Sequence, residues 1–332
     1  MFLIVGDPHI MASNIHEVDH FFSKLSKLIK KTRPTKIIIL GDLLHEHERL
    51  HTSALNKAYD LIKMSSEYAE VYCLVGNHDL INNRQFLTKN HWMNAMKEWP
   101  RVTIVDYPIY VEMNGFSFSA VPYVPPGSFM DALNFIPRWK DSDVIFAHQE
   151  IKGCKMGAII SEEGDEWLDE YPFLVSGHIH SNQWVGKNVY YPGSCMQHAF
   201  GESEKNIITE MAFKDCKTNF VEHDLGLPRK RIVYVDMEDI KKYQIPDTKD
   251  KIKLTVSGNQ QEFKSFKKTK KYKELMSRGV KIVYKYKKDE ELEDKIKKHG
   301  DDNFMTILDN LVKNNANEYL MADYKNLLKN NV

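Results

Sequence analysis

The sequence predicts a layered α/β fold in which two mixed sheets pack together and helices cover their outer faces. Two observations predict this architecture. Continuous apolar runs alternate with amphipathic helical stretches near the N-terminus, which is the order of parallel βαβ units. Later apolar runs follow one another after short turns, which is typical of strands in mixed sheets. With 332 residues, the chain exceeds what one hydrophobic core usually contains, so additional smaller parts are expected.

The N-terminal part alternates strands and helices. Buried strands are predicted at residues 1–7, 36–40 and 71–75. Helices are predicted over residues 15–31, around residues 53–64 and near residues 84–99. Asn14 is suited to cap the first helix, because Glu17 follows it three residues later as in a capping box.

Strands dominate the pattern beyond residue 100. Apolar or alternating runs predict strands at residues 102–105, 109–113, 116–121, 144–147, 173–176, 183–185, 189–191 and 207–213. Asn114-Gly115 is a hairpin turn signal between two of them. Near residue 225 the composition becomes basic, and a strand at 252–256, an amphipathic stretch at 260–276 and a strand at 280–286 predict a small β-α-β module.

Charge is distributed unevenly along the chain. The net charge is zero, but residues 1–225 contain 21 Lys and Arg against 29 Asp and Glu, whereas residues 226–300 contain 22 against 12. A basic module beside an acidic part indicates a polyanionic ligand, although a solvated lysine-rich surface explains the charge equally well. The expected parts are residues 1–225 as the main domain, 226–290 as a basic module, 291–302 as a linker and 303–332 as amphipathic helices.

The composition excludes several classes of protein. No apolar run approaches the roughly 18 residues that span a membrane. The N-terminus has neither the basic start nor the cleavage site of a signal peptide. The four cysteines are scattered without a C-x-x-C pair, which favours reduced thiols in a cytosolic compartment. A cytoplasmic protein is therefore expected.

Five of the predicted strands end in side chains that bind metals. These side chains are Asp7 and His9, Asp42, Asn77 and His78, His148, and His178 and His180. Because strand carboxyl ends converge at one edge of an α/β sheet, we expect them to meet. Mixed carboxylate, imidazole and amide donors suit Mn²⁺, Fe²⁺ or Zn²⁺ better than Mg²⁺ or Ca²⁺, and the absence of thiolates argues against a structural zinc site.

The number of donors fits two metal ions. Seven ligands, one of them a bridging carboxylate, suit ions about 3.5–4 Å apart, which supply a hydroxide and offset charge on a phosphoryl group. A lone histidine would more often be a partly buried structural residue, so the set of five strand ends carries the prediction. His45 fits a capping or surface residue nearly as well as a substrate-facing one. The remaining histidines that we interpret as ordinary residues are His16, His20, His91, His198, His223 and His299.

The motifs, taken in order, resemble those of calcineurin-like metallophosphoesterases. They are Asp7-x-His9, Gly41-Asp42, Gly76-Asn77-His78-Asp79, His148 and Gly177-His178-x-His180. The resemblance covers roughly residues 1–200 and implies a four-layer α-β-β-α sandwich. Gly41-Asp42-Leu43-Leu44-His45 is similar to the Gly-Asp-x-x-His form of DNA-repair nucleases of the SbcD type. A small β-α-β cap followed by C-terminal helices also resembles that family, and the short chain resembles the recombination endonuclease subunits of large bacteriophages.

The resemblance implies a role for each motif residue. One metal, most often Mn²⁺, would be held by Asp7, His9 and His180, and the other by Asn77, His148 and His178, with Asp42 bridging both. His78 would help the leaving 3′ oxygen depart, Asp79 would orient His78, and His45 would assist near the scissile group. Pro8-His9-Ile10 departs from the usual small residue and Leu-Gly around the first histidine.

The implied function is a DNA nuclease subunit. It would act as an exonuclease on double-stranded ends and an endonuclease on single strands, in recombination or repair. Its partners would be an SMC-like ABC ATPase, bound through residues 303–332, and a second copy, bound through the helices around residues 55–64 and 86–96. The DNA contacts expected from charge are Arg229, Lys230, Arg231, Lys267, Lys268, Lys270 and Lys271. The alternatives are a phosphoesterase of small or protein substrates, a silent scaffold of this fold, and terminal helices that pack on their own domain.

Overall fold

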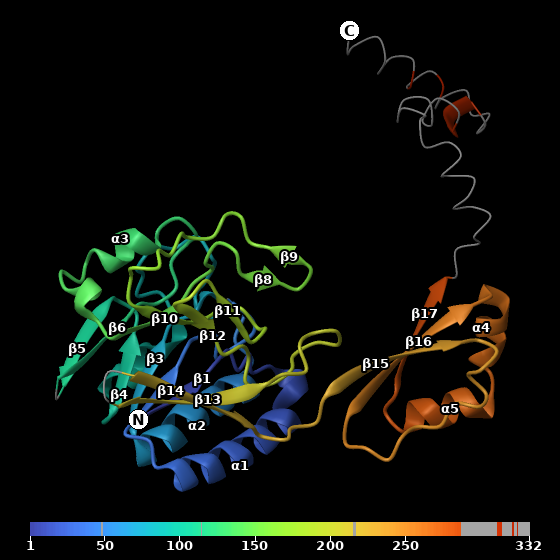
Figure 1. Cartoon of the computed structure of the whole chain (residues 1–332). Helices are drawn as coiled ribbons and strands as arrows, with labels where there is room; N and C mark the ends of the chain where they lie inside the picture. The colour runs from blue at the N-terminus through green and yellow to red at the C-terminus, as the bar shows by residue number, and fades with distance from the viewer. Residues whose placement is uncertain are drawn as a thin grey trace. The chain divides into compact units, whose positions relative to one another are not determined.

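A computed structural model describes most of the chain as two compact units (Figure 1). The structure describes residues 1–47, 49–113, 115–214, 217–286, 311–313, 321 and 324. The first unit comprises Met1–Val233 and Pro246–Lys253, and the second comprises Tyr234–Ile245 and the described residues from Leu254 onward. Within the described residues, no helix combines the length and apolarity needed to cross a membrane.

The first unit contains two six-stranded sheets. The first sheet has the order β14-β13-β1-β2-β3-β4, in which β1 to β4 are parallel and β13 runs antiparallel to β1 and β14. Its strands are β1 (Phe2–Val5), β2 (Lys36–Ile39), β3 (Glu70–Leu74), β4 (Val102–Val105), β13 (Ile207–Lys214) and β14 (Lys217–Asp224). Parallel pairing requires crossovers. α1 (Ile15–Thr32) and α2 (Thr52–Tyr68) supply the first two, and the segment between β3 and β4 supplies the third.

The second sheet also mixes parallel and antiparallel pairs. Its order is β11-β12-β10-β7-β6-β5, with parallel pairs in its centre. Its strands are β5 (Ile109–Met113), β6 (Phe116–Ala120), β7 (Val144–His148), β10 (Phe173–Gly177), β11 (Gln183–Val185) and β12 (Val189–Tyr191). A separate hairpin joins β8 (Lys155–Met156) to β9 (Ile159–Ile160).

Three apolar clusters hold these layers together. Between the sheets, Phe2, Phe118 and Phe146 form part of one cluster, with ring centroids 5.6–5.8 Å apart. On the outer face of the first sheet, α1 and α2 bury their apolar sides, Phe21 among them. On the outer face of the second sheet, α3 (Phe129–Leu133) and the residues around Trp139 form the third. The predicted four-layer sandwich is confirmed.

The segment after β3 differs from its prediction. A helix was expected over residues 84–99, but only the 3₁₀ helix η3 (Trp92–Glu98) forms there. Short polar side chains in the preceding loop hydrogen-bond nearby backbone, as Thr88 Oγ1 does with the N–H of Asn90 at 3.1 Å. Such local bonds compete with helix formation. The other 3₁₀ helices are η1 (Ala12–Asn14), η2 (Asn77–Asp79) and η4 (Trp139–Asp141).

Asn14 precedes α1 as predicted, but its side chain does not cap that helix. Its amide Oδ1 accepts from the N–H of Met11 at 2.9 Å, and its Nδ2 donates to the carbonyl of His9 at 3.0 Å. Asn14 is buried. Its role is therefore to fix the loop after β1 rather than the helix end.

The second unit is built around a three-stranded sheet of order β15-β16-β17. The strands are β15 (Lys230–Asp236), β16 (Lys251–Gly258) and β17 (Lys281–Tyr286), and the first two begin in the first unit. The amphipathic stretch forms two helices, α4 (Gln260–Phe266) and α5 (Lys270–Ser277). Leu254, Phe263 and Leu275 are buried among these elements. The predicted linker 291–302 lies outside the described residues, as do most of residues 303–332, of which 311–313, 321 and 324 are helical.

Candidate metal centre

The predicted ligands converge at the carboxyl ends of five parallel strands. β1, β2 and β3 deliver Asp7, Asp42 and Asn77 from one sheet, while His148 ends β7 and His178 follows β10 in the other. His9 Nε2 lies 2.9 Å from His180 Nε2 and 3.4 Å from Asp42 Oδ2. The strand ends of the two sheets therefore meet, as the sequence predicts.

A second group of donors lies on the other side of Asp42. Asn77 Oδ1 is 3.0 Å from His148 Nε2 and 2.9 Å from His178 Nδ1. His148 Nε2 is also 3.3 Å from Asp42 Oδ2. Because Asp42 Oδ2 is near both His9 and His148, its carboxylate occupies the position of a bridging ligand between the two groups.

Asp7 supplies the clearest sign that a cation belongs in this site. Its Oδ1 accepts from the N–H of His178 at 3.2 Å and lies 3.5 Å from His148 Nδ1. Its Oδ2 is buried and has no hydrogen-bond partner among the described residues. A buried carboxylate oxygen without a donor is costly, and a divalent cation would satisfy it. The donor set, mixed carboxylate, imidazole and amide, fits the same conclusion.

The backbone is strained where it presents these ligands. Asp7, His9, Asp42 and His178 have φ angles of 30°, 42°, 51° and 80°. A non-glycine residue with positive φ costs about 1–3 kcal/mol and persists only where its surroundings fix it. The N–H of His9, for example, donates to the carbonyl of Asp42 at 2.9 Å. The concentration of such residues at the strand ends indicates a functional site.

Two glycines make space for the predicted ligands, because they have no side chain. A Cβ on Gly76 would lie 2.2 Å from Asp42 Oδ1, and a Cβ on Gly177 would lie 2.8 Å from both Asp7 Oδ1 and His148 Nδ1. Any larger residue would therefore displace a ligand. This close approach explains why glycine precedes the ligand in both motifs.

Burial sets the protonation of the histidines. It lowers the pKa of His178 to about 3 and the pKa of His9 well below its ordinary value, so both imidazoles are neutral, as metal ligands must be. Burial alone would also lower the pKa of His148, but the carboxylates of Asp42 and Asp7 raise it to about 9. Without a metal, a proton on His148 would therefore supply positive charge next to these carboxylates, as a bound cation would in the loaded site.

His78 lies at the edge of the ligand groups and is held by the backbone. Its N–H donates to Asp42 Oδ1 at 2.8 Å, and its Nδ1 contacts the carbonyl of His45 at 2.5 Å. Its ring stacks on His47 with centroids 4.5 Å apart, and His45 Nδ1 is 3.4 Å from His9 Nδ1. His45 therefore faces the site, and His47 is a neighbour that the sequence did not indicate.

The prediction that Asp79 orients the His78 ring is corrected. Asp79 Oδ2 accepts from the N–H of Gly76 at 3.0 Å, and Oδ1 accepts from Trp92 Nε1 at 3.0 Å. Burial raises the pKa of Asp79 to about 7, with the nearby charge of Asp42 adding to the effect. Asp79 thus fixes the loop that carries Asn77 and His78, while the carbonyl of His45 orients the imidazole.

Two residues of the site were missed by the sequence interpretation. His198, interpreted as an ordinary residue, has Nε2 at 3.0 Å from the carbonyl of Asp7, and its ring centroid is 4.9 Å from that of His9. Glu202 Oε1 is 3.3 Å from His180 Nδ1, while Oε2 accepts from the N–H groups of His198 and Ala199 at 2.7 and 2.8 Å. Neither follows an apolar strand, so the pattern that found the other ligands could not find them.

Glu202 and His180 form a carboxylate–imidazole pair. Burial alone would raise the pKa of Glu202, but hydrogen bonds from His180 and from the backbone lower it to about 2. Burial alone would lower the pKa of His180, but the bond to Glu202 and the charge of Asp7 raise it. A carboxylate behind a ligating histidine fixes the ring and increases its basicity toward a metal.

The predicted DNA contacts fall into two sets. Arg229 pairs with Asp224 at 2.9 Å, Lys230 with Glu17 at 3.2 Å and Arg231 with Asp250 at 2.6 Å, so carboxylates already balance these cations. The other set belongs to the second unit, where Lys267, Lys268 and Lys270 are exposed and Lys271 pairs with Glu274 at 3.3 Å. A DNA contact stays a prediction for both sets, and the exposed lysines are better placed to make one.

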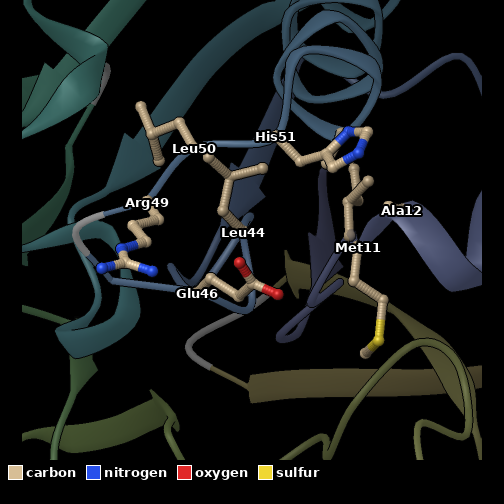
Figure 2. A pocket seen from close by; sticks show the side chains of 9 residues that line it. Met11, Ala12, Leu44, Glu46, Arg49, Leu50 and His51 are labelled. Carbon is tan, nitrogen blue, oxygen red and sulfur yellow. The ribbon is translucent and has the colours of Figure 1, made fainter.

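A small cavity lies next to the metal centre but is not the substrate site. Its volume is about 10 Å³, room for one water molecule. Met11, Leu44, Glu46, Leu50 and His51 are among the lining side chains, which come from the loops after β1 and β2 and from the start of α2 (Figure 2).

Comparison with known proteins agrees with this geometry. Residues 1–205 match the family described as "Calcineurin-like phosphoesterase". "Putative phosphoesterase 244L" of Invertebrate iridescent virus 6 is 46% identical over 276 residues, which cover 81% of this chain and 97% of the relative. "Putative phosphoesterase 078R" of Invertebrate iridescent virus 3 is 41% identical over 313 residues, which cover 92% of this chain and 90% of the relative.

Similarity to solved structures is weak over the whole chain. A protein of unknown function from Aquifex aeolicus is 16% identical, covers 45% of this chain and 80% of its own, and has a TM-score of 0.27. A Themotoga maritima protein studied by NMR is 12% identical, covers 67% of this chain and 96% of its own, and has a TM-score of 0.32. These similarities add nothing to the functional argument.

Proposed function

Because the chain belongs to the calcineurin-like phosphoesterase family, we propose that it is a metal-dependent nuclease that hydrolyses the phosphodiester bonds of DNA. The family uses divalent metals, and two groups of His and Asp side chains here are close enough to hold one. The proposed activity is exonucleolytic on double-stranded ends and endonucleolytic on single strands.

The observation that carries the proposal is the convergence of seven ligand-type side chains, six of them around Asp42. One divalent ion would be held by Asp7, His9 and His180, a second by Asn77, His148 and His178, and both by Asp42. When bound, such ions act as Lewis acids toward phosphoryl oxygens and supply a nucleophile at neutral pH. We propose Mn²⁺ as the native ion, because the donor set includes four imidazoles and one amide beside two carboxylates.

His78 is proposed to act on the leaving oxygen. A carbonyl only accepts hydrogen bonds, so the contact with His45 places a hydrogen on His78 Nδ1 and leaves Nε2 to face the substrate. Burial lowers the pKa of His78, and an anionic phosphate in the site would favour its protonated form. His78 can then donate a proton or a hydrogen bond to the 3′ oxygen as its bond to phosphorus breaks.

DNA is proposed as the substrate because of the second unit. Lys267, Lys268 and Lys270 are exposed and lie in or beside α4 and α5. Cations of this kind bind the phosphate backbone without sequence preference and with strong dependence on salt. The proposed roles in recombination and repair rest on the Gly-Asp-x-x-His motif ending at His45.

The partners are proposed from the sequence pattern. Residues 303–332 would bind an SMC-like ABC ATPase, and the segments around residues 55–64 and 86–96 would join two copies of the chain. Removal of residues 301–332 is expected to spare basal nuclease activity and to abolish stimulation by the ATPase. A severe fall in basal activity would instead assign these residues a role in folding.

A nuclease assay in Mn²⁺ tests the proposed function. The purified chain is expected to degrade linear duplex DNA and to nick single-stranded circles, and a chelator should stop both reactions. Rapid hydrolysis of bis(p-nitrophenyl) phosphate without any DNA cleavage would contradict DNA as the substrate. Failure to bind a divalent metal would contradict an enzymatic role and favour a silent scaffold.

A further inference from the structure

A groove of about 430 Å³ lies in the first unit beside the metal centre. This volume is within the roughly 300–1,000 Å³ range of small-ligand sites. The groove is formed by the loop after β2, the loop after β3 and the start of η3. His47, Ile81, Lys89, Asn90 and Asn94 are among its lining residues. None of these residues is among the predicted metal ligands.

The groove begins at His78. His47 lines the groove, and its ring is stacked on that of His78, with centroids 4.5 Å apart and planes inclined by 17°. Asp79 and Leu80, the next two residues after His78, line it as well. On its other side His78 meets the ligand groups, because its ring centroid is 4.8 Å from that of His9. His78 therefore lies between the metal centre and the groove.

Among its described lining residues, the groove has one cationic side chain and no exposed carboxylate. Lys89 is exposed and has no carboxylate partner among the described residues. Asp79 is buried and accepts hydrogen bonds from Gly76 and Trp92, so its charge is directed into the protein. The groove surface is thus suited to an anion.

The groove also has apolar surface. Ile81 and Leu50 line it and expose 45% and 39% of their surface. A nucleotide combines a base with apolar faces and an anionic phosphate, and both parts find matching side chains here. A free inorganic anion would leave the apolar surface uncovered.

We propose that this groove binds the nucleotide whose 3′ oxygen leaves, with Lys89 contacting its phosphate. The proposal rests on the proposed nuclease function and extends it with a binding site on the leaving-group side of His78. A phosphodiester bound at the strand ends places its leaving oxygen at His78. The nucleoside attached to that oxygen then extends along His47 into the groove.

The test compares Lys89→Ala with Lys24→Ala in the full chain. Lys24 is exposed on α1, has no carboxylate partner among the described residues, and does not line the groove, so the control removes the same charge elsewhere. Binding of a fluorescent single-stranded oligonucleotide is measured in chelator, where no cleavage occurs, over a series of salt concentrations. Lys89→Ala is expected to raise Kd about three- to tenfold and to reduce the salt slope by about 0.7.

Kinetics in Mn²⁺ separate this site from the metal centre. Lys89→Ala should raise KM for the oligonucleotide about as much as Kd, whereas Lys24→Ala should leave both this KM and the hydrolysis of bis(p-nitrophenyl) phosphate at their wild-type values. An unchanged Kd and salt slope would overturn the proposal while leaving the nuclease function intact. A changed sedimentation coefficient with unchanged Kd would also overturn it, because the segment 86–96, which contains Lys89, would then join two copies and cover the groove. A wild-type chain that neither binds nor cleaves DNA would overturn both proposals.

Discussion

The polar residues of the two units occupy opposite environments. In the first unit, the strand ends bury Asp7, Asp42 and His148 almost completely and bring the His148 ring within 3.5 Å of Asp7 Oδ1 and 3.3 Å of Asp42 Oδ2. In the second unit, Lys267, Lys268 and Lys270 are exposed. Burying these charged groups costs free energy, which a bound cation would help to offset, whereas exposed lysines cost almost nothing.

This difference decides how much each region reveals about function. A buried set of carboxylates and imidazoles with an unpartnered oxygen requires an explanation, and a metal centre gives one. An exposed set of lysines fits a DNA-binding surface and a solvated surface equally well. The following predictions test the two regions in turn.

Replacement of the central carboxylate should have the largest effect. Asp42→Ala removes the group that lies between both ligand sets, so hydrolysis of any phosphodiester should fall by more than about 10⁴-fold. Manganese binding, measured by calorimetry, should weaken at the same time. An Asp42→Ala chain with two tightly bound ions and substantial activity would show that the carboxylate does not bridge.

Replacement of the edge histidine should separate chemistry from metal binding. His78→Ala should lower the rate of DNA cleavage about 10²- to 10⁴-fold, because a positioned proton donor is lost. Metal content, measured by elemental analysis, should equal that of the wild type. A loss of metal would reassign His78 as a ligand.

Replacement of the carboxylate behind His180 should weaken the metal site without emptying it. Glu202→Gln keeps the size of the side chain but removes the charge that His180 Nδ1 faces, so affinity for Mn²⁺ should fall about 10- to 100-fold. Glu204→Gln is the matched control, since Glu204 is half-exposed and forms an ion pair with Arg229 at 3.5 Å, away from His180. Equal metal affinity in the two variants would show that Glu202 has only a structural role.

Replacement of the exposed lysines should have the smallest effect. Joint substitution of Lys267, Lys268 and Lys270 by Ala should reduce the salt dependence of duplex DNA binding by up to about 0.9 per lysine. Hydrolysis of bis(p-nitrophenyl) phosphate should not change. Arg231→Ala should leave the salt slope unaltered, because Asp250 already balances this arginine. A larger loss from Arg231 than from the three lysines would reverse the assignment of the DNA-binding surface.

Much of the fold and of the metal centre could be predicted from the sequence, because both depend on local patterns. A buried parallel strand is a continuous apolar run, and a ligand after it stands at a fixed position along the chain. The strand-end positions of Asp7, Asp42, Asn77 and His148 were predicted in this way, and their role as ligands stays a prediction. The order and direction of the strands then bring these side chains together, although no further sequence pattern indicates that they meet.

The features that were missed depend on contacts between distant segments. Glu202 faces His180 from a loop before β13, and no spacing rule connects the two. The segment before Trp92 has a helical apolar pattern, but side chains such as Thr88 satisfy its backbone locally instead. Asp79 follows His78 directly, yet its carboxylate turns toward Trp92 because that indole N–H lies within reach. Tertiary structure decides each of these cases.

The most direct test of the metal centre is an anomalous difference map from crystals of the chain soaked in Mn²⁺. The geometry predicts two peaks flanking the Asp42 carboxylate, with Asp7, His9 and His180 at one and Asn77, His148 and His178 at the other. His78 should contact neither peak. A single peak held by His9, His45 and His78, which are also close enough to share an ion, would contradict the two-metal site.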